Sequence, residues 1–565
     1  MKTIKWVLGI LGAVTFLIIA LCFTILQSAK QKEYVNTLPA TTGKTVTYLL
    51  IDGLSKTIFE KQLAEGNLPN INRLIESGTY VQNGISSFPS MTGYGFYPFL
   101  TGIDATKSGV LGLRWFDRTR TEGNLRNYVG RSNIHMNLDV TQEYQGVFEY
   151  FDEFYTSSIN SYMNKGVHQS QKTGWEMTSA KYYYKPLFKF FRAIPYFGKR
   201  ITYSYFDHET YVAGLVMDQL EHNPKVQWVT FASPDASHHV SGTTEEYPKL
   251  LQHIDGLVGD IRYKIKELGQ EDERMIVLIS DHGNSEVQKN LDLRVNFQED
   301  LSLQLERGES TVLTTSELDS PFEEFAGKDG YFVINGNLSA YLYMKDPNEK
   351  VSENAWGNRL SYNQITHYTN GEKQIDLPKY ISNIEGIELV SYIFNDSTII
   401  VQNKFGKGTI STNAQGKYKY FVTDNDPLEY QNDSIASRLM DDQFHSANMW
   451  LEASFKTNYP DALHRLFSLV SKPDMGDILI CTLENYDLAK DYEMLIGNYR
   501  GGHGGIRAEM LNVPYVLYTP GQNSQDIPFA RSEDVGATIL EYLDMDTEYE
   551  LDGKSLLHSA VNSQN

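Results

Sequence analysis

Apolar runs with the length of buried strands alternate with amphipathic segments along much of this chain. The predominantly apolar runs lie at residues 46–51, 226–231, 274–279 and 513–518. Segments with helical spacing lie between or after them, at 55–65, 247–268 and 533–543. Strands and helices that alternate in this way predict an α/β fold with a doubly wound, mostly parallel sheet.

The pattern changes between residues 287 and 430. Helical periodicity fades there, and short strand candidates such as 330–334 and 397–401 dominate, with turn signals such as Asn335-Gly336. We interpret this part as an inserted β-rich cap subdomain. It separates two parts of a catalytic core, which we place at 45–286 and 431–565. The strand candidate 477–482 falls in the second part of that core.

The first 30 residues have the pattern of a membrane segment. Lys2 and Lys5 precede a largely apolar, charge-free run from Trp6 to Leu26. At about 1.5 Å per residue, this run is long enough to span a hydrocarbon core of about 30 Å. Lysines flank it on both sides, so charge only weakly favours an orientation with the rest of the chain outside. We predict a transmembrane anchor at 1–30 and a polar stalk at 31–44, with a cleaved signal peptide as the alternative.

Net charge and cysteine content indicate which partners and which cellular compartment to expect for this protein. The formal net charge of −21 repels nucleic acid backbones at long range, so no nucleic acid polymer is expected as a partner. Cys22 and Cys481 are the only cysteines, and an exported protein without disulfides is typical of a bacterial cell surface. A basic aromatic stretch at 181–192 stands out from the acidic background. It is either a helix with its aromatic side chains packed inward or a lipid-facing surface.

Candidate metal ligands follow the ends of the predicted strands, where a parallel sheet commonly builds its site. They are Asp52 after the first run, Asp235 and His239 after the second, Asp281 and His282 after the third, and His503 in the loop 501–505. Carboxylate and imidazole ligands without a thiolate suit zinc or manganese. The turn 88–95 adds the hydroxyl of Thr92, which needs a base or a metal to lower its pKa before it attacks phosphorus.

The ordered series of motifs resembles the alkaline phosphatase superfamily, and within it the nucleotide pyrophosphatase/phosphodiesterase branch. The series covers nearly all of residues 45–560. Besides the Asp52 strand, it comprises Phe88-Pro89-Ser90-Met91-Thr92 with Leu100-Thr101-Gly102, Asp235 to His239, Asp281-His282-Gly283, Gly502-His503-Gly504, and a tail from Asp534 to Leu556. The resemblance implies an alkaline phosphatase-like fold, a phosphate-ester substrate and two divalent metal ions, preferably Zn²⁺, with Mn²⁺ as the alternative.

Carried over residue by residue, the resemblance implies two ligand sets. One ion would be held by Asp235, His239 and His503, and the other by Asp52, Asp281, His282 and the Thr92 oxygen. Thr92 would then attack phosphorus and form a phosphothreonine intermediate. His238 remains an alternative ligand to His239, and Ser90 remains an alternative nucleophile to Thr92.

Two departures from the family pattern concern the substrate. Where the phosphodiesterase branch has an Asn on a phosphate oxygen, this chain reads Gly112-Leu113-Arg114-Trp115. Arg114 is a candidate to bind phosphate bidentately, with a surface ion pair as the alternative. Tyr94 follows the nucleophile turn and is a candidate to stack on a leaving group, with a core position as the alternative. An arginine on the phosphate would favour monoesters.

These observations together predict a metal-dependent hydrolase of phosphate esters at the outer face of a cell membrane. A phosphodiesterase or pyrophosphatase is the leading interpretation. The alternatives are a phosphomonoesterase, a transferase that moves a phospho-head group onto a lipid or glycan, and a catalytically silent binding protein.

Overall fold

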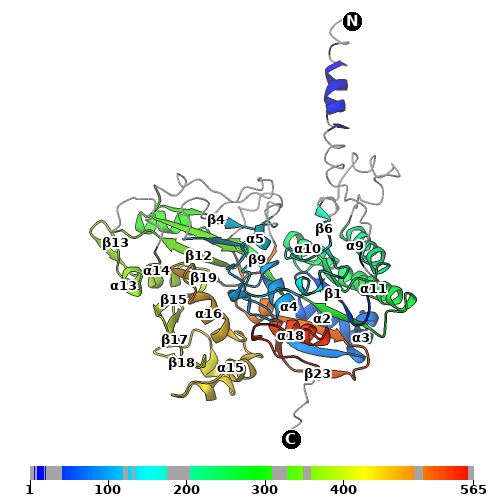
Figure 1. The fold of residues 1–565 in the computed structure, drawn as a ribbon. Helices are drawn as coiled ribbons and strands as arrows, with labels where there is room; N and C mark the ends of the chain where they lie inside the picture. The colour runs from blue at the N-terminus through cyan, green and yellow to red at the C-terminus, as the bar shows by residue number, and fades with distance from the viewer. Residues whose placement is uncertain are drawn as a thin grey trace.

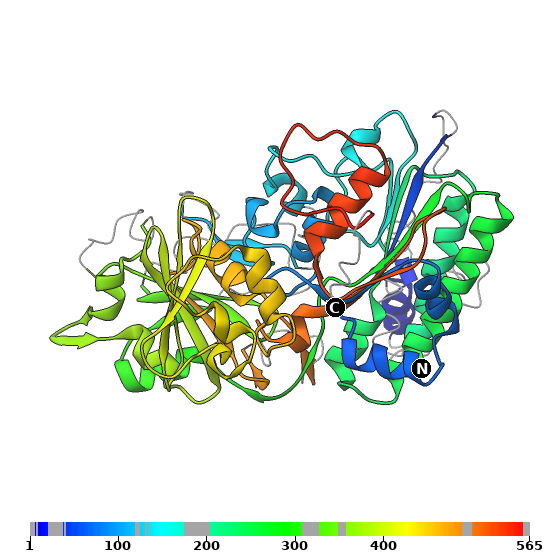
Figure 2. The same ribbon diagram turned by 90° about the horizontal axis from the view of Figure 1, so that it is seen from below.

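The computed structural model consists of two lobes that lie side by side, each built on its own β-sheet (Figures 1 and 2). It describes residues 6, 9–17, 19–20, 38, 41–118, 125–129, 133, 135–174, 204–307, 327–347, 358–488 and 500–557. The first lobe has a nine-stranded sheet and the second an eight-stranded one.

The nine-stranded sheet has the strand order β23-β2-β22-β8-β1-β7-β5-β6, with β24 beside β2. Its centre consists of β1 (Thr45–Ile51), which pairs in parallel with both β7 (Val226–Phe231) and β8 (Arg274–Ile279). Only β22 (Asn512–Tyr518) runs against its neighbours β8 and β2 (Thr79–Ile85) among the described strands. The remaining strands are β5 (Ser157–Ile159), β6 (Gln169–Gln171), β23 (Gln525–Ile527) and β24 (Ala530–Arg531). A mostly parallel central sheet is therefore confirmed.

Both faces of this sheet are buried, which explains why its strands are apolar without alternation. In β1, Tyr48 and Leu50 pack into one hydrophobic cluster, whereas Leu49 and Ile51 pack into another on the opposite face. The Leu49 face is covered by α2 (Lys56–Ala64), α3 (Pro69–Glu76), α9 (Tyr205–Leu220) and α11 (Glu246–Glu267). The Tyr48 face is covered by α4 (Tyr97–Thr101) and α18 (Ser532–Tyr542), among others.

The second lobe contains the sheet β10-β11-β12-β19-β15-β16-β17-β18. Its strands are β10 (Leu305–Arg307), β11 (Gly330–Asn335), β12 (Ser339–Met344), β15 (Ile387–Asn395), β16 (Thr398–Gln402), β17 (Lys407–Thr412), β18 (Tyr418–Val422) and β19 (Ile478–Thr482). The strand at 477–482 was predicted to belong to the catalytic core, but Ile480 pairs with Ala340 of β12 and Val390 of β15. An apolar strand suits the middle of either sheet, so its composition could not decide between them.

Smaller elements connect and flank the two sheets. The short strands are β3 (Arg114–Phe116), β4 (Leu125–Asn127), β9 (Ser285–Asn290), β13 (Tyr368–Asn370), β14 (Lys373–Ile375), β20 (Asn485–Asp487) and β21 (Gly501–Gly502). The additional helices are α5 (Met136–Asp139), α10 (Ser233–Ser241), α12 (Leu293–Asn296), α13 (Tyr362–Thr366), α14 (Leu377–Ser382), α15 (Ala447–Ser454), α16 (Ala462–Val470) and α17 (Ala508–Leu511).

The predicted membrane segment falls mostly outside the described residues. Among the residues that are described, no helix combines the length and the apolar character needed to cross a bilayer. The basic aromatic stretch 181–192 also lies outside the described residues. The anchor, the stalk and the domain boundaries therefore stay predictions.

Candidate metal centre

Three adjacent parallel strands deliver acidic side chains to one edge of the nine-stranded sheet. Asp52 follows β1, and Asp281 follows β8. After β7 the chain enters α10, which carries Asp235 and His239 four residues apart, one turn along the same helix face. Gly53 allows the segment after β1 to approach α10 closely, since a Cβ at position 53 would lie 3.0 Å from the Asp235 side chain.

The predicted ligands lie within contact distance of one another. His282 Nε2 lies 3.4 Å from Asp52 Oδ1 and 3.7 Å from Asp281 Oδ2, and its ring stacks on His503 at 3.9 Å between centroids. His239 Nε2 lies 3.3 Å from Asp235 Oδ2. Among the predicted ligands, potential ligand atoms within 4.8 Å of one another form the groups Asp52-Asp281-His282 and Asp235-His282-His503. The grouping differs from the carried-over assignment because His282 lies between the two sets and His239 at the margin.

The Thr92 hydroxyl lies at this cluster. Its Oγ1 donates a hydrogen bond to Asp52 Oδ1 at 3.3 Å and lies 3.2 Å from His282 Nε2. Thr92 is partly exposed, whereas Asp281 and His282 are fully buried. Thr92 is therefore more exposed than the Asp281 and His282 side chains beside it.

All three histidines are held in the tautomer that a metal ligand requires. Each places Nδ1 within hydrogen-bonding distance of a backbone carbonyl: His239 at Gly501 (2.8 Å), His282 at Gly283 (2.8 Å) and His503 at Ser90 (2.9 Å). A carbonyl only accepts, so Nδ1 must carry the proton and Nε2 keeps its lone pair. Backbone carbonyls orient metal-binding histidines in this way in many proteins.

The carboxylates of the cluster lie close together and lack a lysine or arginine partner in the described part of the chain. Asp235 Oδ1 and both oxygens of Asp281 are buried without a hydrogen-bond partner in the described chain. Burial and the charge of Asp235 raise the pKa of Asp281 to about 8. Burial and the neighbouring Asp281 and Asp235 also raise the pKa of Asp52. Divalent cations would supply the missing partners, so the residues present fit a two-ion centre.

Metal affinity should therefore depend on pH. Without metal, the folded protein holds a proton on Asp281 up to pH about 8, whereas the unfolded chain releases it near 3.8. The stability of the metal-free fold should fall as pH rises through this window, because the folded state binds more protons than the unfolded one. A divalent ion must displace that proton, so its affinity should rise up to about tenfold per pH unit from pH 6 to 8 and then level off.

Equilibrium dialysis against buffered Zn²⁺ at several pH values measures this dependence. Burial and the neighbouring His503 lower the pKa of His282 well below its usual value, so protonation of this imidazole does not mask the effect above pH 6. An affinity that is flat between pH 6 and 8 would contradict the carboxylate account.

The sequence left Ser90 as an alternative to Thr92 and His238 as an alternative to His239, and the side chains of each pair lie in different surroundings. Ser90 is fully buried, and its Oγ donates to the Gly505 carbonyl at 3.0 Å while accepting from Gly504 N at 3.1 Å. His238 is also fully buried and packs edge-on against Tyr247, and burial lowers its pKa to about 4. Thr92 and His239 are thus the members of each pair whose side chains face the cluster.

Changing Ser90 to alanine should reduce stability rather than abolish any activity. The substitution leaves the buried Gly504 N–H without its acceptor, which costs about 1–3 kcal/mol. The Ser90 backbone carbonyl that orients His503 is retained. Urea unfolding should show the loss, and a large fall in metal content would instead give the hydroxyl a direct role.

Arg114 and Tyr94 both occupy buried positions. Arg114 is 1% exposed, and its Nη1 donates to the Ile334 carbonyl at 3.1 Å. It is therefore not a surface ion pair. Tyr94 is fully buried in the core. Burial raises the pKa of its hydroxyl, and so does the nearby charge of Asp104, which lies outside the metal cluster. Both residues were candidates for substrate binding because they lie next to a motif, but each side chain is packed inside the protein.

The second lobe supports the centre through contacts that could not be predicted from the sequence. The turn between β11 and β12 donates two backbone hydrogen bonds to the His503 carbonyl, from Asn337 (2.8 Å) and Leu338 (3.0 Å). Gly336 permits this contact, since its φ is +63° and a Cβ there would lie 2.5 Å from that carbonyl oxygen. The Asn335-Gly336 pair indicated a turn, but nothing in the sequence indicated what the turn would touch.

The fold and the site define an α/β protein with a carboxylate–histidine centre at the carboxyl edge of its sheet. The family model described as "Type I phosphodiesterase / nucleotide pyrophosphatase" matches residues 46–506. The chain therefore belongs to this family of phosphate-ester hydrolases.

Similarity to individual proteins is lower and partial. Human ectonucleotide pyrophosphatase/phosphodiesterase family member 1 is 25% identical over 230 residues, which are 39% of this chain and 21% of that protein. Mouse bis(5'-adenosyl)-triphosphatase enpp4 is 39% identical over 69 residues, 11% of this chain and 15% of that protein. The matches thus span about a fifth or less of these relatives' length.

A solved structure of murine ectonucleotide pyrophosphatase/phosphodiesterase 5, an inactive variant in complex with AMP, superimposes with a TM-score of 0.50. The superposition covers 91% of this chain and 98% of that one at 11% identity. At this identity the likeness concerns the fold alone.

Proposed function

We propose that this protein hydrolyses a phosphodiester or pyrophosphate bond through Thr92 at a two-metal centre. The observation that carries the proposal is the position of the Thr92 hydroxyl, 3.3 Å from Asp52 and 3.2 Å from His282 Nε2, at the exposed side of the ligand cluster. Asp52, Asp235, His239, Asp281, His282 and His503 would hold the ions, with Zn²⁺ proposed and Mn²⁺ as the alternative.

Two bound divalent ions would lower the pKa of the attacking hydroxyl and neutralise charge on the leaving oxygen. Asp52 accepts the hydrogen bond of Thr92 and is therefore placed to take its proton. The Thr92 oxygen then forms a bond to phosphorus, and the bond from phosphorus to one alcohol breaks. The alcohol leaves as its alkoxide, which takes up a proton from solvent, and Thr92 carries the remaining phosphate ester as a phosphothreonine intermediate.

Water completes the cycle at the same phosphorus. Its oxygen bonds to phosphorus and releases a proton to solvent, the bond to Thr92 breaks, and the proton held by Asp52 returns to the threonine oxygen. The product is a phosphate monoester. The stacked rings of His282 and His503 stay fixed throughout, because their Nδ1 atoms are tied to backbone carbonyls.

The environment of Arg114 supports a diester over a monoester substrate. A monoester carries a second negative charge, which a cation at the non-bridging oxygen would favour. Arg114 is instead bonded to the Ile334 carbonyl, and its backbone exchanges two hydrogen bonds with the Asn335 side chain.

The proposal is tested by comparing an aryl phosphodiester with the matching monoester, using protein loaded with Zn²⁺ or Mn²⁺. We expect turnover of the diester to exceed that of the monoester. A monoester preference would overturn the diester assignment. Absence of turnover with either compound, at full metal content, would favour transfer of a phospho-head group to a lipid or glycan.

We also propose that the catalytic part lies outside the cell, held by the N-terminal apolar run or released after its cleavage. The lysines that precede the charge-free run at residues 6–26 motivate this proposal. Protease added to intact cells should then degrade the catalytic part, whereas protection until the cells are lysed would overturn the proposed location.

A further inference from the structure

A basic pocket lies at the edge of the nine-stranded sheet opposite the candidate metal centre. It is a cavity of about 340 Å³ between α3, α11, the first residues of β8 and the last residue of β22. Arg274 begins β8, whereas the metal-site residue Asp281 follows the end of the same strand. The volume suits a small molecule rather than a macromolecule.

Cations dominate the charged lining of this pocket. Arg73, Arg262, Lys266 and Arg274 line the pocket together with a single carboxylate, that of Glu271. The whole chain carries a net charge of −21, so such a concentration of positive charge runs against its general composition. Lys266 Nζ lies 3.7 Å from Glu271, which neutralises one cation in part. Arg73 and Arg262 remain as the main source of positive potential in the pocket.

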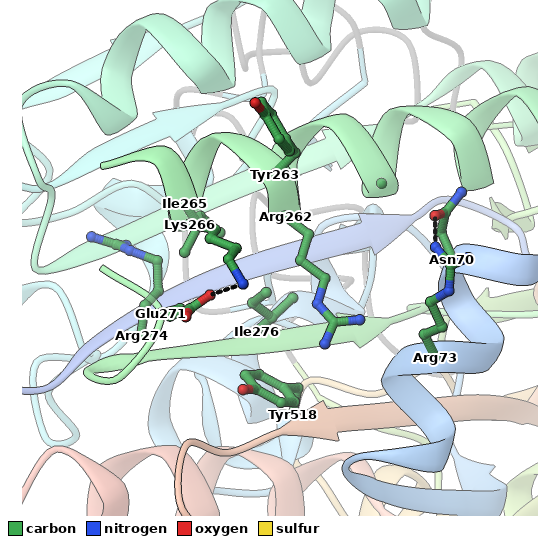
Figure 3. A pocket seen from close by; sticks show the side chains of 11 residues that line it. Asn70, Arg73, Arg262, Tyr263, Ile265, Lys266, Glu271, Arg274, Ile276 and Tyr518 are labelled. Carbon is green, nitrogen blue, oxygen red and sulfur yellow. Dashed lines mark hydrogen bonds and ion pairs between the residues drawn. The ribbon is translucent and has the colours of Figure 1, made fainter. Parts of the chain in front are cut away.

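Arg262 is arranged as an anion-binding arginine. It extends from α11 toward Tyr518, and its guanidinium lies 5.3 Å from the centre of that ring (Figure 3). It makes no ion pair with a carboxylate in the described part of the chain. Packing on an aromatic ring fixes the guanidinium plane and leaves its edge N–H groups for an oxyanion.

Arg73 supplies a second guanidinium from across the pocket. It rises from α3 beside Asn70, and its Nη1 donates to Asn70 Oδ1 at 3.3 Å (Figure 3). That contact involves a neutral amide, so the charge of Arg73 is not compensated by it. Two arginines from different helices can bind separate oxygens of one phosphate group.

Arg274 adds a fixed positive charge behind the pocket. It is fully buried, and its hydrogen bonds go to neutral oxygens of Thr47, Gln270, Asn223 and Pro224. No carboxylate is among these partners, so its charge still acts on the neighbouring cavity. Ile265 and Ile276 provide apolar wall beside the cations.

We propose that this pocket binds a phosphate group of a small phosphomonoester, held by Arg262 and Arg73 with Tyr518 at its side. The group can come from a free organic phosphate or from a phospholipid headgroup, which present the same oxyanion. The proposal is independent of the proposed catalytic activity.

Calorimetric titration of the full chain with glycerol phosphate tests the site, after removal of divalent metal by a chelator. The metal-free catalytic centre lacks the ions that would bind a phosphate group, so binding reports on the pocket. We expect saturable one-to-one binding that an Arg73→Gln/Arg262→Gln double variant weakens at least tenfold. Lys249→Gln, at the exposed amino-terminal part of α11 and paired with Glu245, is the matched control and should bind as the original protein does.

A second arm distinguishes the source of the phosphate. Flotation with phosphatidic acid vesicles, compared with phosphatidylcholine vesicles, detects a lipid headgroup. Binding to either probe that is lost in the double variant supports the site. Equal affinity in the double variant, or no saturable binding to either probe, would overturn it. Arg73 is exposed, so the single Arg73→Gln variant carries the comparison if the double variant does not fold.

Discussion

Replacing Thr92 with alanine is expected to lower kcat for an aryl phosphodiester by at least about 10³-fold while metal content stays unchanged. Removing the hydroxyl removes the atom that forms the bond to phosphorus. The six carboxylate and histidine ligands are untouched by this substitution, so the ions should stay bound. Steady-state kinetics and elemental analysis of the same preparation measure both quantities.

Thr92→Ser is the matched variant, because it keeps an oxygen at this position and loses only a methyl group. It should retain a measurable part of the turnover and should carry an acid-stable phosphoserine in place of the phosphothreonine. If Thr92→Ala turns over the diester at the original rate, water must attack phosphorus directly and the covalent step is wrong.

Changing Asp281 to asparagine should have opposite effects on the metal-free and metal-loaded protein. The side chain is fully buried, and its charge is unfavourable without an ion because burial and Asp235 raise its pKa to about 8. Asparagine stays neutral in the folded state without taking up a proton, so the metal-free fold should be as stable as the original or more so. The variant should also lose metal affinity by a factor on the order of 10² and turnover with it.

Thermal unfolding with and without Zn²⁺ shows both effects. A ligand present at about 1,000 times its Kd adds about 4 kcal/mol to stability, and most of that increment should disappear in Asp281→Asn. Asp255→Asn is the control, because Asp255 is also buried but caps α3 by accepting from Ile71 N at 2.8 Å. It should lose stability in both states and keep its metal. A metal-induced rise in Tm that survives in Asp281→Asn would exclude Asp281 as a ligand.

The sheet and the position of the centre could be predicted because both depend on local pattern. Asp52, Asp235 and Asp281 each come after an apolar run, and parallel pairing of the three strands brings those ends together. Strand β19 was misplaced since its apolar composition suits either sheet. The contacts of Arg114 could not be predicted, because its partners, Ile334 and Asn335, are 220 and 221 residues away in the chain and no local pattern encodes that contact.

The hydrogen bonds from the β11–β12 turn to His503 have a consequence for protein engineering. The nine-stranded lobe cannot be excised as a minimal enzyme. Removing the second lobe would remove the two hydrogen bonds to the backbone carbonyl of His503, which is one of the proposed ligands. Exchanging whole lobes between relatives to alter substrate choice would carry the same penalty. Grafting of individual surface loops, with the turn at 335–338 left intact, is the route that this architecture permits.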